Sequence, residues 1–135
     1  MDAVMYLRFV HDVPVDGLNA RQGFLAAAYL LNRNIALDDS FKRSLAEHIS
    51  WSEDILAQPD RFNRSKSKGA WRRNTKGLSW FRSSATDHID RAIALNDLLA
   101  QRGIVIATLR TDRIGYVVYQ DDYQVVAEPF ADTPR

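Results

Sequence analysis

The chain has 135 residues, of which 46% are hydrophobic and 26% charged, the proportions of a globular protein rather than a disordered one. It contains no cysteine, which excludes disulfide bonds, thiolate metal sites and cysteine nucleophiles. Eighteen basic and 17 acidic residues give a net charge of +1, which by itself indicates no class of partner. We expect a single cytoplasmic domain over 1–135, because the longest apolar run (24–31) is too short to cross a bilayer and the first residues lack the order of a signal peptide.

The first part of the chain predicts a strand followed by two helices. Apolar residues at positions 5, 7 and 9 alternate with Tyr6 and Arg8, which is typical of a strand with one polar face. Asn19 and Gln22 have the spacing of a capping box, which predicts that a helix begins after Asn19. A second helix is predicted from Asp38-Asp39-Ser40 to Pro59, and its buried stripe would comprise Phe41, Leu45, Ile49 and Leu56.

The last part of the chain predicts one helix and three strands. The helix is expected to open at Ser83-Ser84 and to end at Gly103, because apolar residues recur at helical spacing between them. Residues 104–110, 116–120 and 123–130 are β-branched and aromatic runs separated by short polar turns, which favours an antiparallel meander. The fold class expected is therefore α+β, in the order β-α-α-α-β-β-β, with a four-stranded, mainly antiparallel sheet and the helices packed on one face.

Basic charge is concentrated between residues 61 and 82. This segment holds eight of the 18 basic residues, and no acidic residue occurs between Asp60 and Asp87. The remainder holds ten basic and 17 acidic residues, a formal charge of −7. Such asymmetry is informative about partners rather than about fold. We expect residues 61–77 to form an exposed basic loop inserted between helices two and three.

The basic segment also contains aromatic residues, and this combination is typical of nucleic-acid binding. Basic side chains neutralise phosphates, and aromatic rings stack on bases. The residues expected to contact such a polyanion are Arg64, Lys66, Lys68, Trp71, Arg72, Arg73, Lys76, Trp80 and Arg82. Three alternatives stay open: a solvated loop with Trp80 and Phe81 turned inward, an acidic protein or second copy as partner, and a phosphorylated small molecule.

A different hypothesis is a small enzyme or ligand-binding domain with its pocket between the third helix and the sheet. The pocket candidates are Arg82, His88, Tyr119, Asp122 and Gln124, with His88 the one candidate for catalysis because a helix N-terminus favours a neutral imidazole. Gly69 and Gly77 fit no phosphate-binding loop, and the three histidines fit no metal-binding spacing. We therefore expect no cofactor and no metal, and a binding protein rather than an enzyme.

Several strings in the second half carry a family resemblance. They are Trp80-Phe81-Arg82, His88-Ile89, Gly115-Tyr116-x-Val118-Tyr119 and Gln124-Val125-Val126-Ala127-x-Pro129-Phe130. They resemble a family of short, uncharacterised bacterial proteins, which implies a coherent bacterial domain and no particular chemistry. Residues 116–119 with Gln124-Val125 are more remotely similar to the last strand pair of poly-ADP-ribosyltransferases. There a catalytic glutamate precedes the tyrosine, and this chain has Gly115 at that position.

Overall fold

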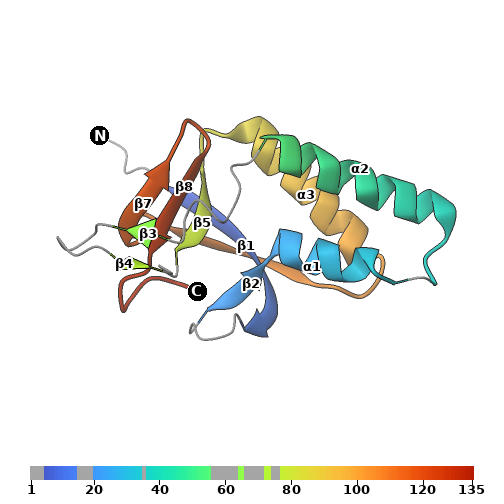
Figure 1. Cartoon of the computed structure of the whole chain (residues 1–135), viewed down its shortest axis with the longest axis horizontal. Helices are drawn as coiled ribbons and strands as arrows, with labels where there is room; N and C mark the ends of the chain where they lie inside the picture. The colour runs from blue at the N-terminus through green and yellow to red at the C-terminus, as the bar shows by residue number, and fades with distance from the viewer. Residues whose placement is uncertain (1–4, 15–19, 35, 56–63, 66–71, 74–76) are drawn as a thin grey trace. The chain divides into compact units, whose positions relative to one another are not determined.

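The computed structural model describes residues 5–14, 20–34, 36–55, 64–65, 72–73 and 77–135 (Figure 1). Within these ranges the helices are α1 (Phe24–Asn32), α2 (Asp39–Ile55) and α3 (Thr86–Ala100). The strands are β1 (Tyr6–Pro14), β2 (Arg21–Gly23), β3 (Arg64–Ser65), β4 (Arg72–Arg73), β5 (Leu78–Arg82), β6 (Ile106–Thr111), β7 (Tyr116–Gln120) and β8 (Gln124–Glu128).

The strands form one large sheet and one small one. The large sheet has the order β2-β1-β5-β8-β7, with β6 also paired to β1, whereas β3 and β4 pair separately. The pairs β1–β2, β1–β5, β5–β8 and β7–β8 are all antiparallel. The predicted α+β class and the mainly antiparallel sheet are confirmed, but the count of four strands is wrong because β2 and β5 join the sheet. The packing of the helices on one face and the single domain stay predictions.

The two additional strands were missed for local reasons. In β5, Leu78, Trp80 and Phe81 are all buried, so the strand lacks the alternation that marks a half-exposed strand. β2 occupies the place of the predicted capping box, and α1 begins only at Phe24 with Gly23 as N-cap and no side-chain cap. The capping prediction is therefore wrong; Asn19 lies outside the described residues.

The polar face predicted for β1 is also wrong. Residues 7–10 are all buried, and Arg8 is as inaccessible as Leu7, at 6% exposed. Met5, which was expected on the apolar face, is 38% exposed. β1 is a central strand of the sheet and pairs with β2, β5 and β6. Because its side chains are buried on both faces, exposure does not alternate along residues 7–10.

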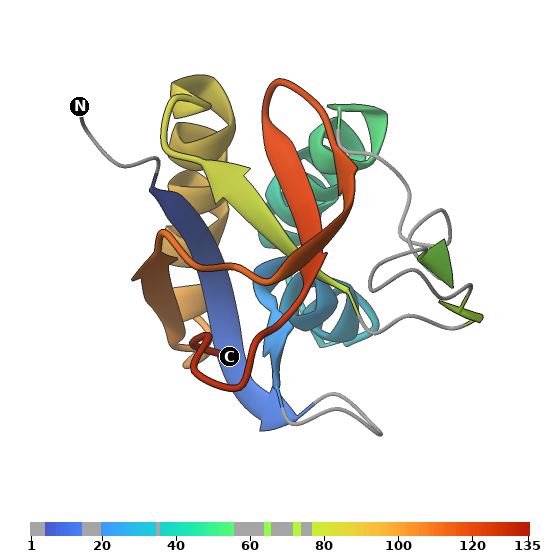
Figure 2. The same ribbon diagram turned by 90° about the vertical axis from the view of Figure 1, so that its left-hand side faces the viewer.

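The chain divides into two compact units. The first, which we call the sheet unit, comprises Met1–Arg8, Ala57–Ile89 and Thr108–Arg135; the second, the helical unit, comprises Phe9–Leu56 and Asp90–Ala107. In the sheet unit, β8 lies between β5 and β7, as Figure 2 shows in yellow-green and red. All five residues of β8 are buried. Trp80 on β5 is completely buried and pairs in register with Val125, so the core of this unit is built on β5 and β8.

In the helical unit, α1 and α2 pack against each other (Figure 1). Phe41, Leu45 and Ile49 are buried at helical spacing, which confirms that part of the predicted stripe; Leu56 lies outside the described residues. The Phe41 backbone N–H donates to Asp38 Oδ1, so the predicted capping of α2 is confirmed.

Two arginines from residues 90–107 form ion pairs with α2 and with its N-cap residue. Arg91 pairs with Glu47 at 3.2 Å, and Arg102 with Asp38 at 3.0 Å.

Two glycines have backbone conformations that other residues rarely adopt. Gly103 has φ +79° and ends α3 in a Schellman motif, because its N–H donates to the Ala100 carbonyl and the Ile104 N–H to the Leu99 carbonyl. The predicted end of the third helix is thus confirmed. Gly115 has φ +122°, and a Cβ there would lie 1.8 Å from the carbonyl oxygen of Glu128. Glycine is required at Gly115 both by conformation and by space.

Candidate polyanion-binding site

Only part of the basic segment belongs to the described chain. Its described residues are the strands β3 and β4 and residues 77–82. The predicted contact residues Lys66, Lys68, Trp71 and Lys76 lie outside them. β3 and β4 pair antiparallel, with Arg64 opposite Arg73 and Ser65 opposite Arg72. Residues 61–77 therefore include a short two-stranded ribbon, which the prediction of a plain loop did not anticipate.

The backbone register of the ribbon pairs two basic residues, Arg64 and Arg73. Like charges directly opposite each other on antiparallel strands are destabilising. Between Asp60 and Asp87 the chain offers no carboxylate that could offset them locally.

The aromatic and basic residues at the end of the segment belong to the core and to the sheet. Trp80 is 0% exposed, so its ring offers no face on which a base could stack. Phe81 is also buried. This burial agrees with the alternative in which Trp80 and Phe81 turn inward, and Trp80 is left out of the contacts proposed below.

Arg82 is bound by the turn between β7 and β8. Its Nε donates to the backbone carbonyl of Asp121 at 2.9 Å, and its Nη2 donates to Gln120 Oε1 at 2.8 Å. Its backbone N–H donates to the Tyr123 carbonyl at 2.8 Å. The guanidinium is therefore held by the protein itself, through acceptors 38 and 39 residues further along the chain.

The turn that holds Arg82, residues 121–123, is organised by one carboxylate. Asp121 Oδ1 accepts the backbone N–H groups of Tyr123 at 2.8 Å and Gln124 at 2.7 Å, and Oδ2 accepts the Tyr119 hydroxyl at 2.9 Å. Burial alone would raise the pKa of the Asp121 carboxyl, but these hydrogen bonds and His88 lower it below the usual value. The short polar turn predicted between the last two strands is thus formed here, with Asp121 as its organising residue.

His88 lies in the first turn of α3 and packs on the same turn of the sheet unit. It is 8% exposed, and its ring stacks on that of Tyr123 with the centroids 4.2 Å apart and the planes inclined by 21°. The centroid of the Phe81 ring lies 6.4 Å from the centroid of the His88 ring. Burial lowers the pKa of the imidazole below its ordinary value of 6.5, against the opposing effect of the Asp121 and Asp87 carboxylates.

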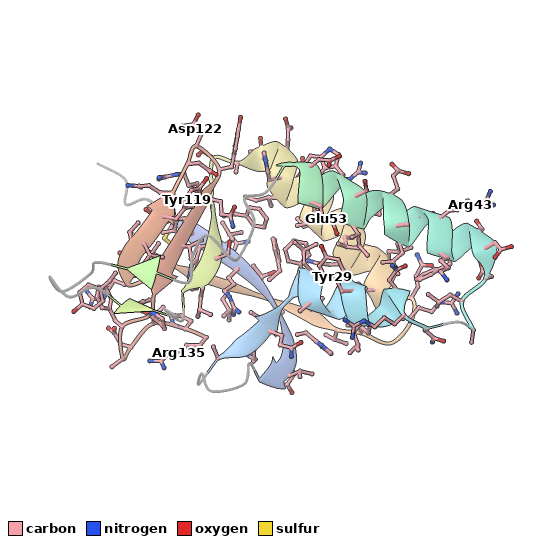
Figure 3. The ribbon with its side chains drawn as sticks, viewed as in Figure 1. Tyr29, Arg43, Glu53, Tyr119, Asp122 and Arg135 are labelled. Atoms are coloured by element: carbon pink, nitrogen blue, oxygen red, sulfur yellow. The ribbon has the colours of Figure 1, made fainter. Side chains whose placement is uncertain are left out.

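Four of the five pocket candidates (Arg82, His88, Tyr119 and Gln124) contact the β7–β8 turn or the neighbouring strand β5, and each has a partner within the protein. Arg82 and Tyr119 donate to the turn, and the Gln124 amide donates to the Ser79 hydroxyl. Asp122 lies at the exposed end of the hairpin near Tyr119 (Figure 3). An open hollow on α2, lined by Asp39, Lys42, Arg43 and Ala46, contains none of the five. The polar groups at the turn thus stabilise the hairpin.

Sequence reasoning missed the residues that connect this network. Asp121 was predicted only as a turn residue and Tyr123 only as the first residue of the last strand, and Ser79 was given no role. A run of Asp-Asp-Tyr between two strands signals a turn but carries no information on which distant arginine or histidine it contacts. Glu128 in the sheet unit is charged and buried as well. Its position in a β-branched run did not indicate that its side chain would be buried.

Within the described part of the chain, no group of three or more histidine, aspartate or glutamate side chains is arranged to hold a metal ion. None of the helices in that part is long and apolar enough to cross a membrane. Comparison of the chain with protein-family models, with curated proteins and with solved structures gives no match. The bacterial family resemblance stays a prediction.

Proposed function

We propose that the protein binds a polyanion, most concretely a nucleic acid, through the basic segment between residues 61 and 76. The observation that carries the proposal is the acid-free cluster of basic residues together with the β3–β4 ribbon, in which Arg64 and Arg73 occupy opposed positions. Their guanidinium groups would contact phosphates, together with Arg72 and Lys76. Trp71 would stack on a base.

The charge of the rest of the chain supports a localised contact. Outside residues 61–82 the formal charge is −7, which would repel a polyanion from most of the surface. Binding would therefore be confined to the ribbon and its neighbours. Because a chain without cysteine suits a reducing compartment, we place this activity in the cytoplasm.

Salt dependence tests the proposal directly. For about five phosphate contacts, log K should fall with log salt concentration with a slope of about −3 to −5. The measurement is a fluorescence-anisotropy titration of a labelled single-stranded RNA of mixed sequence at several salt concentrations. A double-stranded DNA of equal length serves as the second ligand and shows which form is preferred.

Charge reversal provides the matched comparison. The triple variant R72E/R73E/K76E should lose binding altogether, because six units of charge change within the proposed contact. The control variant R33E/K42E/R43E makes the same change at exposed positions 33, 42 and 43 of the helical unit, and should bind as the wild type does. Equal affinity of the first variant and the wild type, or equal loss in both variants, would contradict the proposal.

The pocket hypothesis receives less support from the same structure. Its side chains Arg82, Tyr119 and Gln124 already donate hydrogen bonds to the hairpin or to Ser79. A binding pocket needs polar groups that converge on a ligand. We therefore do not propose an enzyme. If neither nucleic acid binds in the anisotropy titration, the alternative of an acidic protein as partner is favoured.

A further inference from the structure

We infer that His88 and the β7–β8 turn form an acid-sensitive latch on Arg82. With His88 neutral, the turn is closed and holds the guanidinium; when His88 takes up a proton, the turn opens more often and Arg82 is released to solvent for a larger fraction of the time. If the basic segment binds polyanions as proposed above, the released Arg82 adds one phosphate contact at low pH. This last consequence rests on the proposed function, whereas the latch itself does not.

The geometry makes His88 a support of the turn. Its ring stacks on the ring of Tyr123. The backbone of Tyr123 makes two hydrogen bonds within the turn region. The Tyr123 N–H donates to Asp121 Oδ1 and the Tyr123 carbonyl accepts the Arg82 N–H. Displacement of the imidazole therefore removes packing from Tyr123, a residue whose backbone bonds both Asp121 and Arg82.

The charges around the imidazole determine how it responds to acid. Arg82 on β5 is a cation bound to the same turn, while Asp87 on α3 and Asp121 are the nearby carboxylates. Tyr6 on β1 lies opposite Arg82, Tyr119 on β7 donates to Asp121, and Asp122 and Tyr123 belong to the turn itself. The remaining charged or titratable residues of α3 and β1 are Asp90, Arg91 and Asp97 on α3 and Arg8, His11 and Asp12 on β1. An imidazolium is attracted by Asp121, whose carboxylate is already engaged by three donors. A charged His88 would therefore compete with these three donors for the Asp121 carboxylate.

The direction of the pH effect follows from the burial of the ring. Burial lowers the pKa of His88 in the closed turn, so the open turn, with an ordinary value near 6.5, binds the proton more tightly. The closed form is therefore fully favoured above about pH 6.5 and loses stability as the pH falls below that value. One such proton raises the open-to-closed ratio by at most about tenfold at pH 5.5.

Nuclear magnetic resonance of the full chain without any nucleic acid tests the latch. The quantities are the protection factors of the Tyr123 and Gln124 amides and the chemical shift of the Arg82 Nε–H, each followed from pH 7.5 to 5.5. We expect protection to fall up to about tenfold and the Arg82 signal to move toward that of a free guanidinium, with the midpoint at which the His88 ring protons titrate. A midpoint that instead coincides with His11 or His48, or no change at all, would overturn the inference.

The variant His88→Gln keeps a polar side chain but cannot take up a proton in this range. Its Tyr123 and Gln124 protection should no longer depend on pH, whereas Asp87→Asn should keep the dependence. An unchanged pH dependence in His88→Gln overturns the latch. Should His88→Gln not fold, the coincidence of midpoints in the wild-type protein decides the question by itself.

RNA titrations at pH 5.5 and 7.5 are a separate measurement. A failure to bind RNA at either pH contradicts the proposed function and leaves the latch unaffected.

Discussion

The two ends of the basic segment differ in what surrounds their arginines. At the β3–β4 ribbon, Arg64 and Arg73 occupy opposed positions in a stretch without any acidic residue. At the other end, Arg82 donates to a backbone carbonyl and to a glutamine side chain of the β7–β8 hairpin. The first end is basic in sequence with no acidic residue between Asp60 and Asp87, and the second has its guanidinium donors bound within the protein.

This difference teaches that a basic run in a sequence need not act as one unit. An arginine whose donors are occupied by carbonyl and amide oxygens stabilises the fold and contributes less to an external contact. Substitutions at the hairpin should therefore change the free energy of unfolding and leave polyanion affinity at neutral pH unchanged. Substitutions at the ribbon should do the opposite. Three experiments of decreasing expected effect test this division.

The largest effect is expected at Gly115, where the hairpin begins. Gly115→Ala would force a Cβ against the Glu128 carbonyl at a φ that disfavours side chains, and should lower the free energy of unfolding by more than about 3 kcal/mol. Gly103→Ala is the control, since it also has a positive φ but nothing lies within 4 Å of its Cβ, and about 1 kcal/mol is expected. Urea titrations of the three proteins give the comparison, and equal losses would show that the close approach to Glu128 is unimportant.

The next effect is expected at the carboxylate that organises the turn. Asp121→Ala removes the acceptor of two backbone N–H groups and one hydroxyl, and should cost about 3 kcal/mol. The neighbouring variant Asp122→Ala changes an exposed side chain and should stay within about 0.5 kcal/mol of the wild type. Urea titration at pH 7.5 measures both. If RNA affinity at that pH falls in Asp121→Ala while the protein remains folded, the separation of hairpin and ribbon is wrong.

The smallest and most discriminating effect compares two arginines directly. Arg73→Gln should make the slope of log K against log salt less steep by about 0.7 to 0.9, the value of one phosphate contact. Arg82→Gln should leave that slope unchanged at pH 7.5 and lower the free energy of unfolding by about 1 to 2 kcal/mol. The reverse pattern, with Arg82→Gln changing the slope and Arg73→Gln the stability, would exchange the roles of the two ends.

Much of the secondary structure could be predicted because its causes are local. The stripe of Phe41, Leu45 and Ile49 and the cap at Asp38 are readable from residues a few positions apart. The end of α3 at Gly103 and the turn at Asp121 are equally local, since each depends on hydrogen bonds between near neighbours in the chain. The candidate site was predictable only as a concentration of charge, which is a property of composition.

The sequence by itself thus determined where helices end, where strands turn and where basic charge accumulates, because backbone preferences and side-chain periodicity act over a few residues. Only the tertiary structure decided that β5 lies between β1 and β8, and with it the burial of Trp80 and of Arg8. It also decided that Arg82 is bound by the hairpin and that His88 stacks on Tyr123. The order of strands in a sheet depends on which distant segments pair, and no local preference of the residues between them specifies that choice.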